Sequence, residues 1–188
     1  MPAPEDDLEL ALSLADVADR ITLGRFLSKD LAIETKPDLT PVTEADRAVE
    51  QAVREQLAAQ RPADSVLGEE YGVSSAPSSE RRWIIDPIDG TKNYVRGIPV
   101  WATLLALQDG DEIIVGVVSA PAISRRWWAA RGRGAFVADG LGDSPRRIGV
   151  SAVRELSDAQ LCFPGLDDWD GSGGLDGLIE LAARCWRQ

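Results

Sequence analysis

Carboxylates follow a short apolar run in this chain, and their spacing suits a metal ion beside a phosphate group. The run 84–85 ends in Asp86, and Asp89 comes three residues later, directly before Gly90. Mg²⁺ takes oxygen ligands in proteins, usually one or two carboxylates with waters and substrate phosphate oxygens. Backbone N–H groups around Gly90 and Thr91 would suit the phosphate, especially if a helix begins there. This segment therefore predicts a site for a divalent cation and a phosphate.

The same residues could instead form a plain turn, because Asp-Pro and Asp-Gly are common turn dipeptides. An isolated Asp-Gly pair would be interpreted in that way. Here, however, Asp86 lies between a hydrophobic strand and Pro87, at the carboxyl end of the strand. Ligands of open α/β sheets bind at such strand ends. The position therefore favours a binding site.

A second apolar run that ends in carboxylates precedes the first. Residues 66–68 lead into Glu69 and Glu70, and a polar loop at 71–82 separates them from the next run. Taken alone, the pair Glu69-Glu70 would be a solvated turn. If both acidic strand ends converge, their carboxylates repel one another, and a cation between them relieves that repulsion.

Three segments together resemble the signature of a known protein family. They are residues 36–46, which read Lys-Pro-Asp-Leu-Thr-Pro-Val-Thr-Glu-Ala-Asp, the triplet 68–70, and residues 83–94, which read Trp-Ile-Ile-Asp-Pro-Ile-Asp-Gly-Thr-Lys-Asn-Tyr. In this order they are similar to the inositol monophosphatase family of Mg²⁺-dependent, lithium-sensitive phosphatases. Segments 36–43 and 125–136 are most similar to the bacterial histidinol-phosphatase branch.

The resemblance covers most of the chain and implies an α+β fold, a layered α/β sandwich with helices packed on a largely antiparallel sheet. Family members are longer, and a Trp-Asp motif in their C-terminal half supplies a third carboxylate to the second metal. Trp169-Asp170 lies too early in the chain to be that motif. We therefore expect residues 1–188 to be a single N-terminal phosphatase domain that lacks the C-terminal α/β portion. A truncated second subdomain would start after about residue 150.

The resemblance also implies a metal site. Glu69, Asp86 and the backbone carbonyl of Ile88 would ligate a first ion, and Asp86 with Asp89 would contribute to a second. Lys36 lies on the segment that the family uses as a mobile loop near the site. The family's cofactor is Mg²⁺, with two or three ions per site, Mn²⁺ as a substitute and Li⁺ as an inhibitor.

Catalytic and substrate-binding roles follow from the same resemblance. Glu69 and Thr91 would position and activate the attacking water. Asp46 would accept a hydrogen bond from Thr91 and orient it. Gly90 and Thr91 would offer backbone donors to the phosphate, and Asp89 would also contact the substrate. From its sequence alone, Asp46 has a purely structural alternative, since Thr43-x-x-Asp46 has the form of a helix N-cap.

The expected reaction is Mg²⁺-dependent hydrolysis of a small phosphate monoester. The branch resemblance favours L-histidinol phosphate, which would place the protein in histidine biosynthesis, and inositol 1-phosphate is the competing substrate. A catalytically incomplete metal- or phosphate-binding fragment is the alternative of another class. A phosphatase of the haloacid-dehalogenase class would carry Asp-x-Asp-Gly-Thr after a strand, whereas Asp86 and Asp89 are one residue too far apart for that motif.

The composition limits partner and compartment. The net charge of −11 argues against a nucleic-acid partner, because phosphate backbones require stripes of Lys and Arg. The two cysteines form no disulfide framework, which favours a reducing cytoplasm. The acidic N-terminus is not a signal peptide, and no apolar run approaches the ~20 residues that span a bilayer. Without histidine the chain has no Ser-His-Asp triad and no His-ligated zinc. We expect a homodimer that acts on a small phosphorylated metabolite.

Periodicity predicts the elements that must position these residues. Apolar residues recur at helical spacing over 5–27, in a helix that begins at Thr43, and over 175–184. Residues 28–42 read as a loop or short ribbon, and 171–174 as a loop. From Trp101 onward, short strand-like segments follow one another with tight turns between them, which predicts a mainly antiparallel meander. The predicted strands are 64–68, 83–86, 101–107, 112–119, 126–130 and 134–138.

Arginines surround Trp127-Trp128 in one of these strands. Adjacent strand residues point to opposite faces, so at most one of the two tryptophans lines a pocket. The arginines form a basic patch, which we interpret as solvated edge positions that discourage aggregation or as a subunit interface. They are Arg125, Arg126, Arg131 and Arg133.

Overall fold

The structure is a computed structural model that describes the chain except for residues 1–3, 75–79, 141–143, 164, 167–168 and 170–173. It contains two compact units, Met1–Gly149 and Val150–Gln188. The predicted metal and catalytic residues all belong to the first unit. Asp170 of the Trp169-Asp170 pair and most of the predicted loop at 171–174 lie outside the described residues.

The first unit is built on an eight-stranded sheet with the order β10-β9-β8-β7-β6-β5-β3-β4. Strands β3 and β5 pair in parallel, and the other neighbours pair antiparallel. The predicted α+β class with a largely antiparallel sheet is therefore confirmed. The strands are β3 (Ser65–Gly68), β4 (Gly72–Ser74), β5 (Arg81–Asp89), β6 (Ala102–Asp109), β7 (Glu112–Ala120), β8 (Arg125–Ala130), β9 (Gly134–Ala138) and β10 (Arg146–Ile148).

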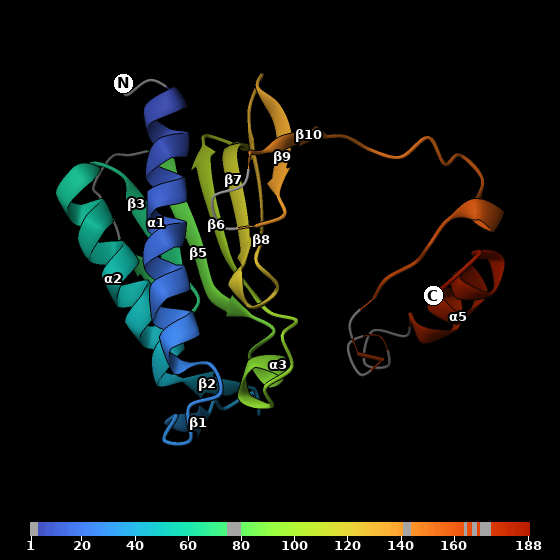
Figure 1. Ribbon diagram of the computed structural model, residues 1–188, viewed down its shortest axis with the longest axis horizontal. Helices are drawn as coiled ribbons and strands as arrows, with labels where there is room; N and C mark the ends of the chain where they lie inside the picture. Colours follow the sequence, from blue (N-terminus) through green and yellow to red (C-terminus); the bar gives the residue numbers. More distant parts are fainter. Residues whose placement is uncertain (1–3, 75–79, 141–143, 164, 167–168, 170–173) are drawn as a thin grey trace. The chain divides into compact units, whose positions relative to one another are not determined.

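Two helices, α1 (Pro4–Arg25) and α2 (Glu44–Gln60), lie side by side on one face of this sheet (Figure 1). Their apolar faces and the sheet enclose the core, in which Leu14, Val53, Trp83 and Leu107 are completely buried. Each such side chain contributes about 1.5–3 kcal/mol through its removal from water. The core thus holds α2 against β5, the strand that carries Asp86.

Helix α2 begins at a capping box, as the sequence predicts. The Thr43 hydroxyl accepts hydrogen bonds from the backbone N–H groups of Ala45 (3.1 Å) and Asp46 (3.4 Å), and the Asp46 carboxylate accepts one from the Thr43 N–H (2.8 Å). These three bonds satisfy backbone donors at the start of the helix. The preceding ribbon is a hairpin of β1 (Ile33–Thr35) and β2 (Pro41–Thr43). This arrangement fixes Asp46 in the first turn of α2, on the buried face of the helix.

An aromatic cluster fixes the short helix α3 (Thr91–Val95), which follows β5. Tyr94 lies 4.9 Å from Trp101 and 5.4 Å from Phe26, measured between ring centroids. Its hydroxyl donates a hydrogen bond of 2.7 Å to the carbonyl of Thr22 in α1. Pairs of this kind contribute about 0.5–1.5 kcal/mol beyond simple burial. The cluster therefore anchors the segment that carries Gly90 and Thr91.

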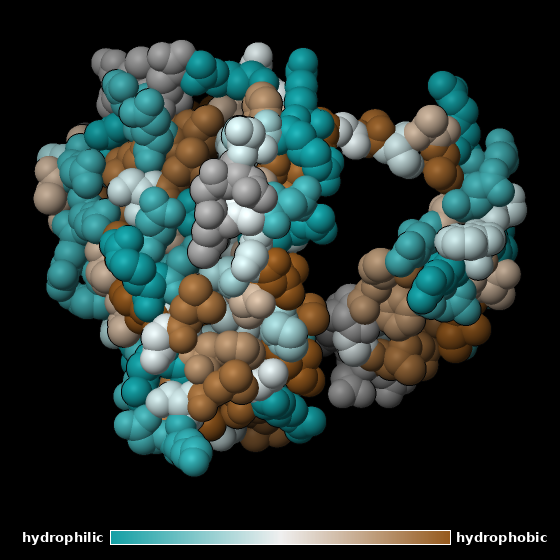
Figure 2. All heavy atoms as spheres, viewed as in Figure 1, coloured by the Kyte–Doolittle hydropathy of each residue, from teal (hydrophilic) through white to brown (hydrophobic). Residues whose placement is uncertain are grey.

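The surface near α3 and the β1–β2 hairpin is more apolar than the outer surface of the helices. In Figure 2, brown atoms gather at the lower end of this unit, where these segments lie in Figure 1. Exposed apolar side chains within them include Leu39, Ile98 and Val100. An apolar border thus lies beside the segments that lead into the predicted site.

The sequence prediction missed two strands and misjudged the basic patch. Strands β4 and β10 have three residues each, too few for a visible alternation. Strand β8 lies inside the sheet rather than at an edge, so the interpretation of its arginines as edge positions is wrong. Arg126 instead donates to the buried Asp19 (2.6 Å) and to Asp16 (2.8 Å), while Arg125 pairs with Asp139.

The prediction for the paired tryptophans of β8 is confirmed. Trp128 packs against the core and stacks on Phe136, with ring centroids 6.2 Å apart. The ring of Trp127 lies 5.5 Å from the guanidinium of Arg125. The two rings thus serve different faces of the strand, as alternation requires.

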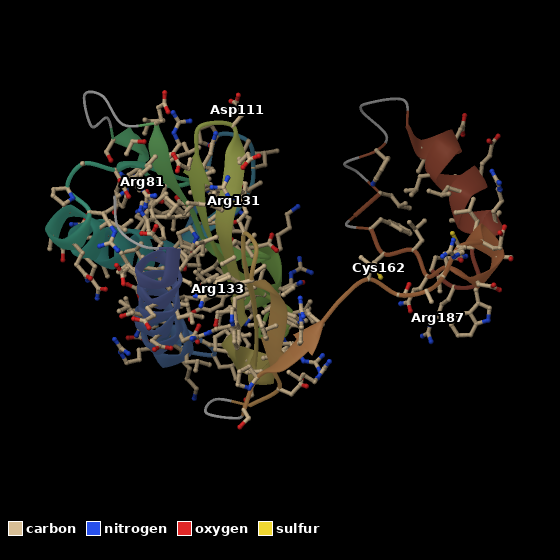
Figure 3. All side chains as sticks on the ribbon, turned by 90° about the horizontal axis from the view of Figure 1, so that it is seen from above. Arg81, Asp111, Arg131, Arg133, Cys162 and Arg187 are labelled. Carbon is tan, nitrogen blue, oxygen red and sulfur yellow. The ribbon has the colours of Figure 1, made fainter. Side chains whose placement is uncertain are left out.

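The second unit contains the short 3₁₀ turn η2 (Leu156–Asp158) and the helix α5 (Leu175–Arg184). The predicted helix at 175–184 is therefore confirmed. Segments near Cys162 and Arg187 run beside each other (Figure 3), and the Leu161 N–H donates to the Arg187 carbonyl at 2.9 Å. A further 3₁₀ turn, η1 (Pro121–Ile123), joins β7 to β8 in the first unit. Within the described residues, no helix is long and apolar enough to cross a bilayer.

Candidate active site

The parallel pair of strands brings the two acidic strand ends together. Gly68 of β3 lies opposite Ile85 of β5, and the Glu69 N–H donates to the Ile85 carbonyl at 3.2 Å. Parallel strands end at the same edge of a sheet, so Glu69 and Asp86 become neighbours. The two acidic strand ends, which the sequence alone could not show to be neighbours, therefore converge in the structure.

A bulge at the end of β5 changes the direction of the strand between its two aspartates. Asp86 pairs with Leu104 and Asp89 with Ala102, so β5 holds one residue more than β6 over this stretch. Pro87 lies in the bulge and has no N–H for the ladder. Its carbonyl accepts a hydrogen bond from the Thr103 hydroxyl (2.8 Å). Bulges re-aim side chains, and this one lies directly between two predicted metal ligands.

The carboxyl group of Asp86 is the most perturbed acid of this region. Burial is the main cause that raises its pKa from 3.8 to about 8, followed by the charge of Glu69 and a hydrogen bond with that residue, and then by the charges of Asp89 and Asp46. Its Oδ1 atom is buried and has no hydrogen-bond partner. An unpartnered buried oxygen among negative charges is what a divalent cation would satisfy. The predicted ligands therefore fit Mg²⁺ in chemistry.

Asp46 and Thr91 meet beside this group. The Thr91 hydroxyl lies 2.9 Å from the Ile88 carbonyl oxygen and 3.4 Å from Asp46 Oδ1. Asp46 is almost completely buried, and burial raises its pKa, although hydrogen bonds from Thr43 act in the opposite direction. The contacts are compatible with both interpretations of Asp46, because one oxygen caps α2 and the other faces Thr91.

Gly90 joins β5 to α3 in a conformation that glycine adopts without strain. Its φ is +87°, in the left-handed region. A Cβ atom at this position would lie 3.0 Å from the carbonyl oxygen of Val100. Both the conformation and the close approach of the backbone thus exclude a larger side chain. The structure places Gly90 next to Asp89 and Thr91 at the same strand end, as the sequence predicts.

Lys36 links the β1–β2 hairpin to the acidic edge. Its Nζ lies 2.7 Å from an oxygen of Glu69 and 2.7 Å from an oxygen of Glu70. Partial burial lowers the pKa of Lys36, but the hydrogen bonds and charges of the two glutamates outweigh this effect and raise the pKa overall. In this arrangement Glu69 faces an ammonium group, and no three candidate metal-binding side chains of the described residues are grouped closely enough to hold an ion.

Two acidic residues that contribute to this geometry were not assigned roles from sequence. Glu50 lies on the buried face of α2 and is bonded to the turn after Glu69, and Glu70 bonds Lys36. A signal for Glu50 was present. It follows Asp46 by four residues, which places a second carboxylate on the inner face of the helix.

Known proteins share both the sequence and the fold. The profile of the Inositol monophosphatase family matches residues 4–163. The chain belongs to the inositol monophosphatase family. A histidinol-phosphatase of Streptomyces coelicolor is 53% identical over 191 residues, and the match covers 100% of this chain and 71% of that protein. A histidinol-phosphatase of Mycobacterium tuberculosis is 58% identical over 182 residues, with 97% and 69% covered.

A solved structure supports the same membership. The inositol monophosphatase of Zymomonas mobilis superimposes with a TM-score of 0.80 at 30% identity, over 100% of this chain and 69% of that one. The family and the fold predicted from the signature segments are therefore confirmed, together with the phosphatase class of the family's members. The roles of the individual residues remain predictions.

Proposed function

We propose that this protein hydrolyses a small phosphate monoester in a Mg²⁺-dependent reaction at the edge formed by β3 and β5. The observation that carries this proposal is the state of Asp86. A half-buried carboxyl group beside three other acids, with one buried oxygen that has no hydrogen-bond partner, has no evident structural use. Groups of this kind cluster at functional sites.

Glu69, Asp86, Asp89 and the carbonyl of Ile88 would hold the metal. The structure supports this set because the parallel pair ends with Glu69 next to β5, and the bulge keeps Asp86 and Asp89 at the same end of that strand. Binding of the ion would draw the carboxylates together, since those of the described residues are not grouped closely enough to hold one. Bound Mg²⁺ supplies a Lewis acid that lowers the pKa of a coordinated water and neutralises developing charge on oxygen. We propose two or three ions per site, replaceable by Mn²⁺ and inhibited by Li⁺.

The chain's own groups would orient the nucleophile and the phosphate. Thr91 is the candidate to hold the attacking water by its hydroxyl, with Asp46 fixing the direction of that hydroxyl across 3.4 Å. Glu69 would accept the proton of the water. Backbone N–H groups of Gly90 and Thr91, with Asp89 beside them, would bind the phosphate group. Positioning carries most of the rate enhancement in phosphoryl transfer.

L-Histidinol phosphate is the substrate that we propose, with a role in histidine biosynthesis. Two histidinol-phosphatases that share more than half of their aligned residues with this chain support this choice. Inositol 1-phosphate is the second candidate, because an inositol monophosphatase has the same fold at 30% identity. A homodimer in the cytoplasm completes the proposal, and light scattering of the purified protein would test the dimer.

The test is release of inorganic phosphate from both substrates with and without Mg²⁺. We expect Mg²⁺-dependent release that favours L-histidinol phosphate, and about 10³-fold slower release from the Asp86→Asn variant. Asp111→Asn is the matched control, since Asp111 is an exposed aspartate in the β6–β7 turn (Figure 3), away from the strand ends that carry the site. Full activity of the Asp86→Asn variant would refute the site. Absence of release by the wild-type chain would favour a catalytically incomplete fragment.

A further inference from the structure

Glu50 is a completely buried carboxylate in the middle of α2. It lies on the helix face that also buries Val49, Val53 and Leu57. Removing an ionised carboxylate from water is costly unless hydrogen bonds and an opposite charge compensate it. A role in stability alone would be served as well by an apolar side chain of the same size. The partners of Glu50 therefore indicate what the charge does.

Those partners belong to the turn that follows Glu69. One carboxylate oxygen accepts a hydrogen bond from the backbone N–H of Glu70 at 2.7 Å. The other accepts from the N–H of Tyr71 at 3.1 Å and from the Arg54 guanidinium at 2.8 Å. Bonds from a charged acceptor to backbone N–H groups are short and strong. Glu50 thus fixes the two residues directly after Glu69.

Arg54 extends the same contact by one residue. Its guanidinium donates a second hydrogen bond to the carbonyl of Gly72 and lies 6.0 Å from the centre of the Tyr71 ring. Glu50 and Arg54 are four residues apart on α2, the spacing at which side chains of a helix meet. The pair therefore binds the backbone of three consecutive residues, 70–72.

Glu50 also lies against the residue before Glu69. A Cβ atom on Gly68 would come within 1.9 Å of a Glu50 carboxylate oxygen. The backbone of Gly68 is not in the left-handed region, so the reason for glycine here is space: a larger residue would displace the Glu50 carboxylate. The Glu50 carboxylate thus borders Glu69 on both sides along the chain.

We propose that Glu50 is a positioning residue that directs Glu69 toward Asp86. The inference rests on the function proposed above, in which Glu69 is a metal ligand. Glu50 is not among the proposed ligands, because its carboxylate is already bonded to Arg54 and to the backbone of Glu70 and Tyr71. It fixes the peptide units on both sides of Glu69, while the Glu69 N–H is bonded to Ile85 in β5. The side chain of Glu69 is 44% exposed and is bonded to Lys36 at its tip, so its direction depends on how the backbone on both sides of it is held.

The test compares Glu50→Gln with wild type by calorimetric titration of Mg²⁺ in the absence of substrate. Glutamine keeps the shape but places an N–H₂ group against the donors of residues 70–71 or Arg54. We expect the Mg²⁺ dissociation constant to rise by about ten- to a hundredfold, the usual effect of losing a partner that orients a metal ligand. Hydrogen exchange of the Glu70 and Tyr71 amides should accelerate in the same variant.

Asp7→Asn is the matched control. Asp7 is another buried carboxylate, 1% exposed, that pairs with arginines at the opposite end of β5. If Glu50 served only the stability of the fold, both variants would weaken Mg²⁺ binding only by lowering the fraction of folded protein. We expect Asp7→Asn to leave the affinity of the folded protein unchanged. A folded Glu50→Gln protein with wild-type affinity would overturn the proposal.

Two further variants keep the test decisive if Glu50→Gln does not fold. Arg54→Met removes the counter-charge of Glu50 but leaves its backbone bonds, and should weaken Mg²⁺ binding several-fold. Wild-type affinity of Arg54→Met would then overturn the proposal. Gly68→Ala should push the carboxylate aside, and its effect on affinity should not add to that of Glu50→Gln.

Phosphate release by wild type is measured separately, so that failure of the proposed reaction is recognised independently of Glu50. A wild-type protein that binds Mg²⁺ yet releases no phosphate would refute the reaction and leave the comparison of Glu50 variants intact. A wild-type protein that binds no Mg²⁺ would refute both.

Discussion

The two ends of strand β5 hold buried carboxylates in opposite electrostatic surroundings. At the end where the strand begins, Asp7 accepts from Arg61 (3.2 Å) and Arg81 (2.9 Å). Asp64 also pairs with Arg81 and accepts a hydrogen bond of 2.9 Å from the Trp83 indole. Figure 3 shows Arg81 between the helices and the sheet. Each buried charge at this end thus has an opposite charge beside it.

At the other end of the strand the acids lie together with little compensation. Asp86 is surrounded by the negative charges of Glu69, Asp89 and Asp46. In the part of the chain that the structure describes, no arginine or lysine forms a salt bridge with Asp86 or Asp89, and Lys36 reaches only the glutamates. The first end therefore contributes to folding, whereas the second keeps a repulsion that a cation would relieve.

The contrast predicts its largest effect for Asp86→Asn. A metal contributes several kcal/mol to a reaction of this kind, so loss of a proposed metal ligand should reduce phosphate release by about 10³-fold. The same change removes a repelled charge, and the metal-free variant should unfold at a higher urea concentration than wild type. Parallel measurement of activity and urea unfolding checks both. A variant that lost stability as well as activity would show that neighbouring groups stabilise the Asp86 carboxyl in the folded chain.

The opposite end predicts the reverse pattern for Asp7→Asn. Loss of this carboxylate leaves Arg61 without its partner and weakens the pairing of Arg81, so the free energy of unfolding should fall by ~3 kcal/mol. Phosphate release per folded molecule should remain that of wild type. Urea unfolding and an activity assay well below the unfolding midpoint would establish this. A fall in activity without a fall in stability would break the contrast between the two ends.

A pH series sharpens the comparison through the raised pKa of Asp86. Because this pKa is about 8 in the folded chain and 3.8 in its ordinary state, the folded chain keeps a proton that the unfolded chain releases. Its contribution to stability is complete below pH 4 and is lost as the pH rises through about 8. Metal-free wild type should therefore lose stability over this interval relative to Asp86→Asn, as urea unfolding at several pH values would show. If the free energy of unfolding changed equally with pH in the two proteins, the pKa of Asp86 would be near its ordinary value.

Sequence patterns predicted the parts of this contrast that depend on neighbouring residues. The capping box at Thr43 and the position of Asp86 at a strand end are local features, readable from a few letters. The pairing of Asp7 with Arg81 joins residues that are 74 positions apart, and only the packing of α1 against the sheet brings them together. Likewise, the sequence left open whether Glu69 meets Asp86, because that depends on which strands pair in parallel.

Basic residues were the least predictable from sequence. Arg125, Arg126 and Arg131 appeared as one exposed patch, yet each pairs with an acid from another part of the chain. The buried partner of Arg126 is Asp19 of α1, 107 residues away. A charge next to apolar strand residues can face the solvent or a buried acid, and the local sequence does not distinguish the two.

Lys36 provides the smallest and most specific test, since it gives a predicted metal ligand at the acidic end the kind of opposite charge that the other end supplies. Its ammonium is bonded to one carboxylate oxygen of Glu69, so it would compete with Mg²⁺ for that oxygen. Pairs of this exposure contribute about 0.2–1 kcal/mol, and Lys36→Met should therefore bind Mg²⁺ only a few-fold more tightly. Calorimetric titration of the two proteins would measure the change. Weaker binding by Lys36→Met would instead mean that Lys36 orients Glu69 for the metal, and the two ends of β5 would then be less different than their charges indicate.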